Sequence, residues 1–171
     1  MKTTTIALAL LAALVFTVPT GWAQTSDDKE HAELAKALKD AKISLQSGLI
    51  ASTKEGTPIS AKYEVEEGKL QLSVYTVKGD KFSEVIVDHK TGKVAKAETI
   101  TKADDLTAAK AQSDAMGKAK RSLNAAASEA GKENKGFRVV SIIPALKDGH
   151  AVAAVTLVKG TDWRTVSEKL D

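Results

Sequence analysis

The strongest constraint on the fold is the segment 59–94, in which apolar and polar residues alternate over several short runs. Residues two positions apart lie on the same face of an extended chain, so each run predicts a strand with one buried face. The turns between the runs fall at Gly68, Gly79 and Gly92, where a residue that tolerates positive φ is needed. The segment therefore predicts an antiparallel meander with one polar face. Its first two apolar sets are Ile59, Ala61, Tyr63, Val65 and Leu70, Leu72, Val74.

Two segments with helical periodicity flank this meander and are expected to cover its apolar face. The first follows a capping-box pattern at Asp27 and Glu30 and predicts one amphipathic helix that ends before Gly56 and Pro58. Its apolar positions are Leu34, Leu38, Ala41, Leu45 and Leu49. The second predicts an alanine-rich helix from Asp104 to Gly131, in which Gly117 indicates a bend or a close contact. Its apolar positions are Leu106, Ala109, Met116, Leu123, Ala127 and Ala130.

A second β-prone region follows the polar connector 132–136. Val140, Ile142, Pro144 and Leu146 alternate with other residues, and Asp148 with Gly149 is a strong hairpin signal before the run 151–158. Because proline cannot donate a hydrogen bond to a neighbouring strand, Pro144 predicts a sheet edge or a bulge. The last apolar residues, Trp163, Val166 and Leu170, suit either a strand or a helical turn.

A shift of 81 positions superimposes much of the two β-prone regions. It places Gly68 on Gly149, Val77-Lys78-Gly79 on Val158-Lys159-Gly160, and Phe82 on Trp163. The same shift puts a helical segment before each set of strands, and the second region has no counterpart of 88–94. The repetition predicts two tandem units that pack together, either as one continuous sheet or face to face.

The N-terminus has the pattern of a secretory signal peptide. Lys2 precedes the apolar run 6–16, and the small residues Gly21 and Ala23 predict cleavage after Ala23. The run is too short to span a bilayer. Removal of the signal peptide, which contains Lys2, leaves 24 basic and 22 acidic residues. The net charge therefore gives no reason to expect a nucleic-acid partner. The chain contains no cysteine, which excludes disulfides and thiolate chemistry.

The closing run Val-Ile-Val-Asp-His-Lys-Thr-Gly-Lys-Val, residues 85–94, carries a resemblance to a known family. Together with the strands before it, this run resembles the PepSY domain. The resemblance covers residues 43–97 and is weaker over 118–171, where the closing Asp and Thr-Gly are missing. It implies a module found in exported proteins and in propeptides of secreted metallopeptidases, with a role in inhibiting or regulating peptidases. It supplies no catalytic residues.

The residue patterns offer little chemistry. His31, His89 and His150 are the only histidines and lie in no metal-binding or catalytic pattern, so we expect no metal, cofactor or catalytic residue. The basic group that includes Lys118, Lys120 and Arg121 is typical of a solvated helix face. Tyr75 is out of phase with Leu72 and Val74, which predicts a place on the open face of the sheet and makes it a candidate for partner contact.

These observations predict an α+β protein of two tandem units, each an amphipathic helix on a small antiparallel meander. The expected boundaries are a signal peptide at 1–23, a first PepSY-like unit at 24–100 and a second, degenerate unit at 101–171. We expect a periplasmic or secreted, non-enzymatic module that regulates an exported peptidase or another envelope protein through the exposed face or edge of the sheet. The alternative is a stress-related envelope module that binds a small molecule or polymer between sheet and helix. A third hypothesis is a hydrolase whose catalytic residues the sequence patterns do not reveal.

Overall fold

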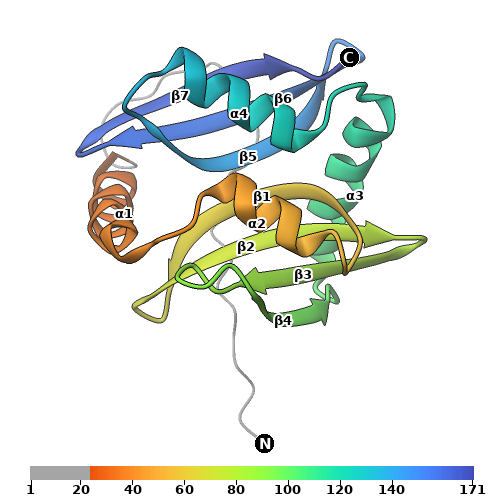
Figure 1. Ribbon diagram of the computed structural model, residues 1–171. Coiled ribbons are helices and arrows are strands. Elements are labelled where there is room, and N and C mark those ends of the chain that lie inside the picture. The colour runs from red at the N-terminus through yellow and green to blue at the C-terminus, as the bar shows by residue number, and fades with distance from the viewer. Residues whose placement is uncertain (1–23) are drawn as a thin grey trace, which may run out of the picture.

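The protein is an α+β fold built on a single antiparallel sheet, seen in a computed structural model that describes residues 24–171 (Figure 1). Seven strands lie in the order β4-β3-β2-β1-β5-β6-β7. The predicted signal peptide lies outside the described residues. The strands are β1 (Thr57–Glu66), β2 (Lys69–Lys78), β3 (Lys81–Val87), β4 (Val94–Thr99), β5 (Arg138–Lys147), β6 (His150–Lys159) and β7 (Asp162–Lys169).

The sheet is continuous because the two β-rich regions join at its centre. Strands β1 and β5 pair antiparallel through Ala61 with Ile142 and Lys62 with Ser141. Of the two arrangements that the sequence leaves open, the continuous sheet is therefore the one adopted. Both central strands carry a register shift just before this junction, between Pro58 and Ser60 in β1 and between Val139 and Ser141 in β5.

Helices α2 (Leu45–Ser52) and α4 (Leu123–Glu133) cover one face of the sheet (Figure 1). Their buried leucines and alanines pack against strand residues with alternating spacing, as the pattern of the meander predicts. The large cluster has fully enclosed members in both helices and in strands from both halves. These include Leu45, Leu123, Ala126, Leu72, Val74, Ile142 and Val155, each less than 3% exposed.

The two long helices of the sequence prediction are wrong, because each segment forms two helices. The first contains α1 (Gln24–Ala37), a 3-10 turn (Leu38–Asp40) and α2, and the second contains α3 (Ala103–Lys118) and α4. Extended backbone at Ala41 and at Ala119 interrupts the helical path. Ser44 and Ser122 then begin the next helices by accepting hydrogen bonds from the backbone N–H of Ser47 and Ala125.

Three further expectations at the helices need correction. The first helix already includes Gln24, so it does not begin at a cap on Asp27. The last helix runs two residues past Gly131 to Glu133. Gly117 lies one residue before the end of α3, and a methyl group there would meet no atom within 4 Å. Gly117 therefore makes no close contact, and in place of a bend within one long helix the chain leaves the helical path two residues later, at Ala119.

Helices α1 and α3 lie at opposite ends of the sheet in the view of Figure 1. The imidazole of His31 on α1 stacks on the indole of Trp163 in β7, with ring centroids 4.1 Å apart. On α3, Leu106 and Ala109 pack in a small second cluster with Tyr75 of β2. Each of these helices therefore packs against strands far from it in sequence.

Pro144 lies in the centre of the sheet and not at an edge, because β5 pairs with both β1 and β6. The pairing of β5 with β1 ends at Ile142. Pro144 lies beyond this point, so its lack of an N–H group costs no hydrogen bond to β1. The predicted bulge exists, but it falls at Val140, four residues earlier. The last segment, which suited a strand or a helical turn, is strand β7.

Candidate functional site

Strand β7 forms one edge of the sheet within residues 24–171. Its eight residues pair with β6 without any register shift. The backbone N–H of Leu170 donates to the carbonyl of Ala151 at 2.9 Å, which fixes the phase of the ladder. Backbone groups alternate in direction along an antiparallel strand, so those of Thr165 and Ser167 point away from β6. The strand therefore presents unpaired main-chain donors and acceptors along its outer side.

The two ends of β7 are held by other elements. At its start, Trp163 carries the stacked ring of His31, and at its end the carbonyl of Lys169 accepts a hydrogen bond from Nη1 of Arg121 at 3.0 Å. Thr165 and Ser167 lie between these contacts, and both are exposed. The section available to another chain is therefore a short, straight and firmly held piece of strand.

The opposite edge, β4, is built differently. It has six residues and a register shift against β3 between Ile86 and Val87. The N–H of Ile100 donates to the carbonyl of Phe82, so the outward groups of β4 belong to Ala97 and Thr99. An ion pair of 2.8 Å joins the side chains of Lys96 and Glu98 on this strand. Short length and a bulge both discourage pairing at an edge. Charged side chains occur on both edges, since Arg164 and Asp162 form an ion pair on β7 as well.

The face of the sheet opposite α2 carries a polar network in the first half of the chain. Ser73 on β2 donates a hydrogen bond of 2.5 Å to the carboxylate of Glu84 on β3, and Gln71 donates to Glu66. Burial raises the pKa of Glu84, the Ser73 hydroxyl partly offsets this rise, and the negative charge of Glu64 adds to it. The network is paired within itself, which is typical of a packed polar surface.

The prediction that Tyr75 lies on an open face is wrong. Tyr75 does point to the face opposite Leu72 and Val74, but α3 covers that face and leaves only 7% of the side chain exposed. Burial is also the first cause of its raised phenol pKa, and the charge of Glu84 adds to it. A direct contact through Tyr75 would require α3 to move away. Sequence periodicity identifies the face of a strand but not which helix covers it.

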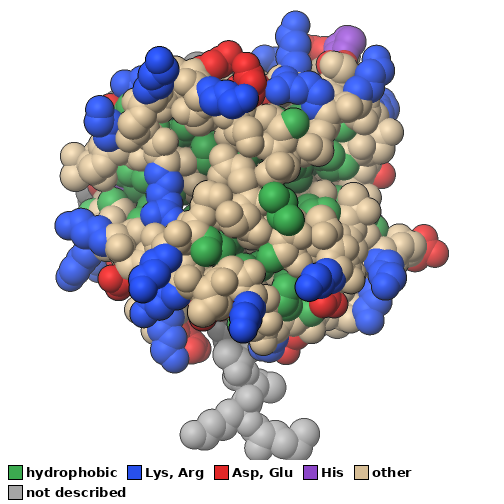
Figure 2. Space-filling model, in the orientation of Figure 1, with side chains coloured by type: hydrophobic (Ala, Val, Ile, Leu, Met, Phe, Trp, Pro, Cys, Tyr) green, Lys and Arg blue, Asp and Glu red, His purple; other side chains and the backbone are tan. Residues whose placement is uncertain are grey.

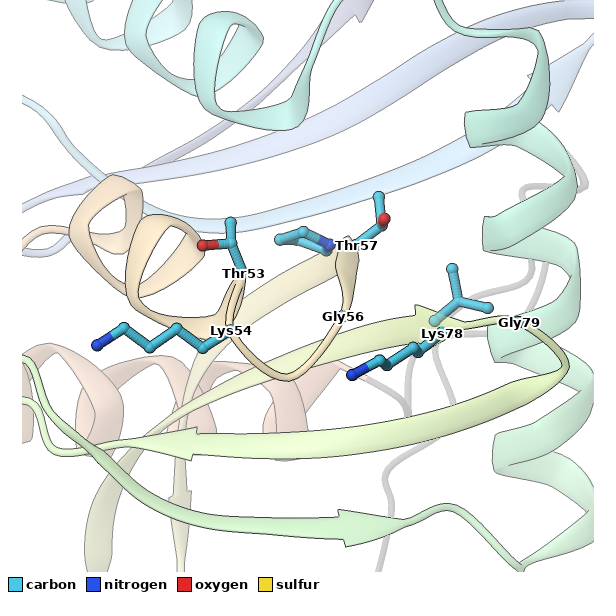
Figure 3. Close-up of a pocket in the computed structure, with 8 residues that line it drawn as sticks. Thr53, Lys54, Gly56, Thr57, Lys78 and Gly79 are labelled. Carbon is cyan, nitrogen blue, oxygen red and sulfur yellow. The ribbon is translucent and has the colours of Figure 1, made fainter.

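Two hollows lie beside the turns at the ends of the strands. One, of about 470 Å³, is lined by the end of α2, the start of β1 and the turn Val77-Lys78-Gly79 (Figure 3). The other, of about 480 Å³, lies between α1 and the turn that joins β6 to β7. Neither lies between the sheet and the helices α2 and α4, where side chains fill the space.

The three histidines occupy unrelated places. His31 stacks on Trp163, and His150 is paired with Asp171 at 2.5 Å, a hydrogen bond that lowers the pKa of this carboxyl group. His89 belongs to the turn after β3, where its carbonyl accepts hydrogen bonds from the N–H groups of Lys42 and Ile43. Among residues 24–171, no group of three or more histidine or acidic side chains could hold a metal ion.

The turn that carried the family resemblance has a clear structural role. The carboxylate of Asp88 accepts hydrogen bonds from the backbone N–H groups of Lys90 and Thr91 and from the Thr91 hydroxyl. These bonds lower the pKa of Asp88, the largest contribution coming from the N–H of Thr91. The residues that define the sequence pattern therefore shape a turn and hold the segment before α2.

The exposed face over α2 and α4 shows no large apolar patch. Figure 2 shows lysine and arginine side chains around this face, with hydrophobic side chains scattered between them. Ile50 on α2, 60% exposed, and Leu146, 42% exposed, are the large apolar side chains that stand out in the described part of the chain. A broad hydrophobic interface is therefore not the main feature of this surface.

Comparisons with known proteins add one distant likeness. No protein-family profile matches the chain, and no curated protein matches it either. Among solved structures, the chain is similar to a protein from Clostridium difficile 630 described as a candidate lipoprotein, with 14% identity and a TM-score of 0.39. The match covers 70% of this chain and 79% of that one. In residues 24–171, no helix has the length and apolar character required to cross a membrane.

Proposed function

We propose that the protein is an exported, non-enzymatic binding module that captures an extended segment of a partner protein on the outer edge of β7. The observation that carries this proposal is the difference between the two sheet edges. Strand β7 pairs with β6 over eight residues without a register shift and presents the outward backbone groups of Thr165 and Ser167, whereas β4 has six residues and a register shift against β3. Addition of a strand at an open edge is a common way to bind an extended peptide.

We also propose that the fold consists of two tandem units related by the 81-residue shift. Several paired features support this. The register shifts fall at Ile59 and Val140, and the central pair Ala61 and Ile142 is itself separated by 81 positions. The turns after β1 and β5 both combine a non-glycine residue and a glycine at positive φ, Glu67 with Gly68 and Asp148 with Gly149.

On this proposal the units are PepSY-like and the partner is an exported peptidase, which the protein inhibits or regulates by contact outside the cytoplasm after cleavage near Ala23. The support is the resemblance of residues 85–94 and the signal-peptide pattern at 1–23. The filled core between the sheet and helices α2 and α4 favours a protein partner over a ligand held between the sheet and these two helices.

The test compares two proline variants that each remove one outward N–H group. Ser167→Pro blocks the edge at β7, and Ala97→Pro is the matched control at β4, because both N–H groups point away from the neighbouring strand. Each protein, purified from the cells that produce it, is added to metallopeptidases from the same culture medium, and the rate of casein hydrolysis is measured. The wild-type protein and Ala97→Pro should slow hydrolysis, and Ser167→Pro should not.

Circular dichroism and thermal unfolding show whether each variant keeps the fold. A Ser167→Pro variant that is folded and slows hydrolysis as well as the wild type would rule out the β7 edge. A wild-type protein that slows none of the peptidases and co-purifies with none would rule out the peptidase partner.

A further inference from the structure

We infer that the hollow between α1 and the β6–β7 turn binds a small amphipathic anion, a single apolar chain that carries one carboxylate or similar head group. This site is separate from the proposed strand-binding edge. Its volume of about 480 Å³ lies within the range of small-molecule sites, which begins at about 300 Å³. Its lining combines two kinds of side chain that together select such a ligand.

The wall of the hollow is apolar. Ala32 and Ala35 of α1, Leu38 of the following 3-10 turn and Val158 of β6 line it. Leu38 and Val158 are also members of the main core cluster, so this wall is continuous with the interior and fixed in place. Apolar surface of this kind gains free energy when a hydrocarbon chain displaces water from it.

The rim of the hollow is cationic and contains no acid. Lys36, Lys39, Arg138 and Lys159 line it, and no aspartate or glutamate does. Within residues 24–171, none of these four side chains forms an ion pair within 4.0 Å. Three of them are exposed lysines, and Arg138 is half-buried. The ammonium group of Lys159 also lies 5.9 Å from the centre of the Phe137 ring.

Arg138 supplies a fixed charge in the lining of the hollow. Its guanidinium donates hydrogen bonds to the carbonyls of Leu38, Ala41 and Ile43 and lies 5.2 Å from the centre of the Tyr63 ring. These neutral partners hold the guanidinium in place and leave its positive charge uncompensated by a carboxylate. The attraction between this charge and an anionic head group would be stronger in the hollow than in bulk water, because the site is partly enclosed and water screens the charges less there.

The second hollow of the molecule provides a matched control. It is lined by the equivalent turn Val77-Lys78-Gly79 and also carries two lysines, Lys54 and Lys78, without an acid. Figure 3 shows both lysine side chains at this hollow. It has no helix in the place of α1 and no arginine in its lining. We therefore expect the amphipathic anion to bind beside α1 and not here.

The experiment is a calorimetric titration of the purified protein with sodium dodecanoate below its micelle concentration. We expect saturable binding, and no binding of dodecyltrimethylammonium or of acetate, because one lacks the anion and the other lacks the chain. The double variant Lys36→Gln/Lys159→Gln should weaken dodecanoate binding by on the order of tenfold, as expected for the loss of two nearby charges. The control Lys54→Gln/Lys78→Gln should bind as the wild type does.

Several results would overturn this inference. They are an absence of dodecanoate binding, equal binding of the cationic surfactant, and an equal loss of affinity in the two double variants. Binding to phosphatidylglycerol vesicles without binding to monomeric dodecanoate would also overturn it, because the ligand would then be a lipid surface.

Discussion

At the scale of single residues, Arg138 joins the segment before α2 to the centre of the sheet. Its three carbonyl partners lie about 100 positions earlier in the chain, at Leu38, Ala41 and Ile43. Nothing in the local sequence indicates this role, because a single arginine at the start of a strand is compatible with plain solvent exposure. Recognition of such a contact requires the tertiary structure.

We predict that Arg138→Lys lowers the free energy of unfolding by about 2 kcal/mol, because a lysine keeps the charge but cannot donate to three separated carbonyls. Urea unfolding followed by circular dichroism measures this change. Arg164→Lys is the control, since Arg164 is exposed and its contacts, with the Phe137 ring and with the exposed carboxylate of Asp162 at 3.4 Å, each contribute less than about 1 kcal/mol. Equal, small effects in both variants would show that the carbonyl contacts are not important for stability.

The raised pKa values of two glutamates predict that the free energy of unfolding decreases as the pH rises. Burial raises the pKa of Glu84 and of Glu168 above 4.5 in the folded state. The folded protein therefore binds their protons more tightly than the unfolded chain, so their contribution to stability is greatest below about pH 4.5 and is lost as the pH rises through the folded pKa.

We predict that Glu84→Gln removes part of this decrease and keeps the hydrogen bond from Ser73, because the amide oxygen can accept it. The measurement is the free energy of unfolding of the wild type and the variant between pH 4.5 and 7. A variant whose stability falls with pH as steeply as that of the wild type would contradict the raised pKa of Glu84.

At the scale of elements, α2 approaches the sheet closely at Gly48. A methyl group at this position would overlap Cδ2 of Leu72, a side chain with no exposed surface. Helical periodicity locates the leucines of α2 but does not show that a glycine between them is the point of closest approach.

We predict that Gly48→Ala lowers the free energy of unfolding by about 1–3 kcal/mol, because the added methyl group overpacks the core at Leu72. Gly117→Ala should instead raise it by up to about 1 kcal/mol, since Gly117 is helical and its surroundings are open. Thermal unfolding of both variants provides the comparison. A stabilising effect of Gly48→Ala would contradict the close packing of α2 on β2.

The sequence predicts the strands better than the helices. Alternation and turn glycines locate the strands between 57 and 87, and Asp148 with Gly149 marks the hairpin between β5 and β6. The break at Ala41 has no proline or glycine beside it, and the break at Ala119 follows Gly117 by two residues. Apolar residues at helical spacing continue through both breaks, so periodicity alone does not show them. The serines that cap α2 and α4 are the available signals, and each is followed by a leucine of the core.

At the scale of the whole molecule, the pairing of β1 with β5 determines which strands form the outer edges of the sheet, where a partner could bind. This junction makes one sheet with two outer edges, β4 and β7. The sequence could predict both meanders but not which strands would meet, because pairing at the centre depends on long-range contacts. The covering of Tyr75 by α3 is likewise a consequence of the assembled fold, and of the face and the edge that the sequence offers it leaves the sheet edge as the candidate site.

The β7 edge is tested most directly by amide hydrogen exchange, residue by residue, in the free protein and with the peptidase bound. In the free protein, Thr165 and Ser167 should exchange rapidly, and Val166 and Glu168, whose N–H groups point to β6, should exchange slowly. When the peptidase binds, Thr165 and Ser167 should become protected. Protection that appears instead at Ala97 and Thr99, with β7 unchanged, would contradict strand addition at β7.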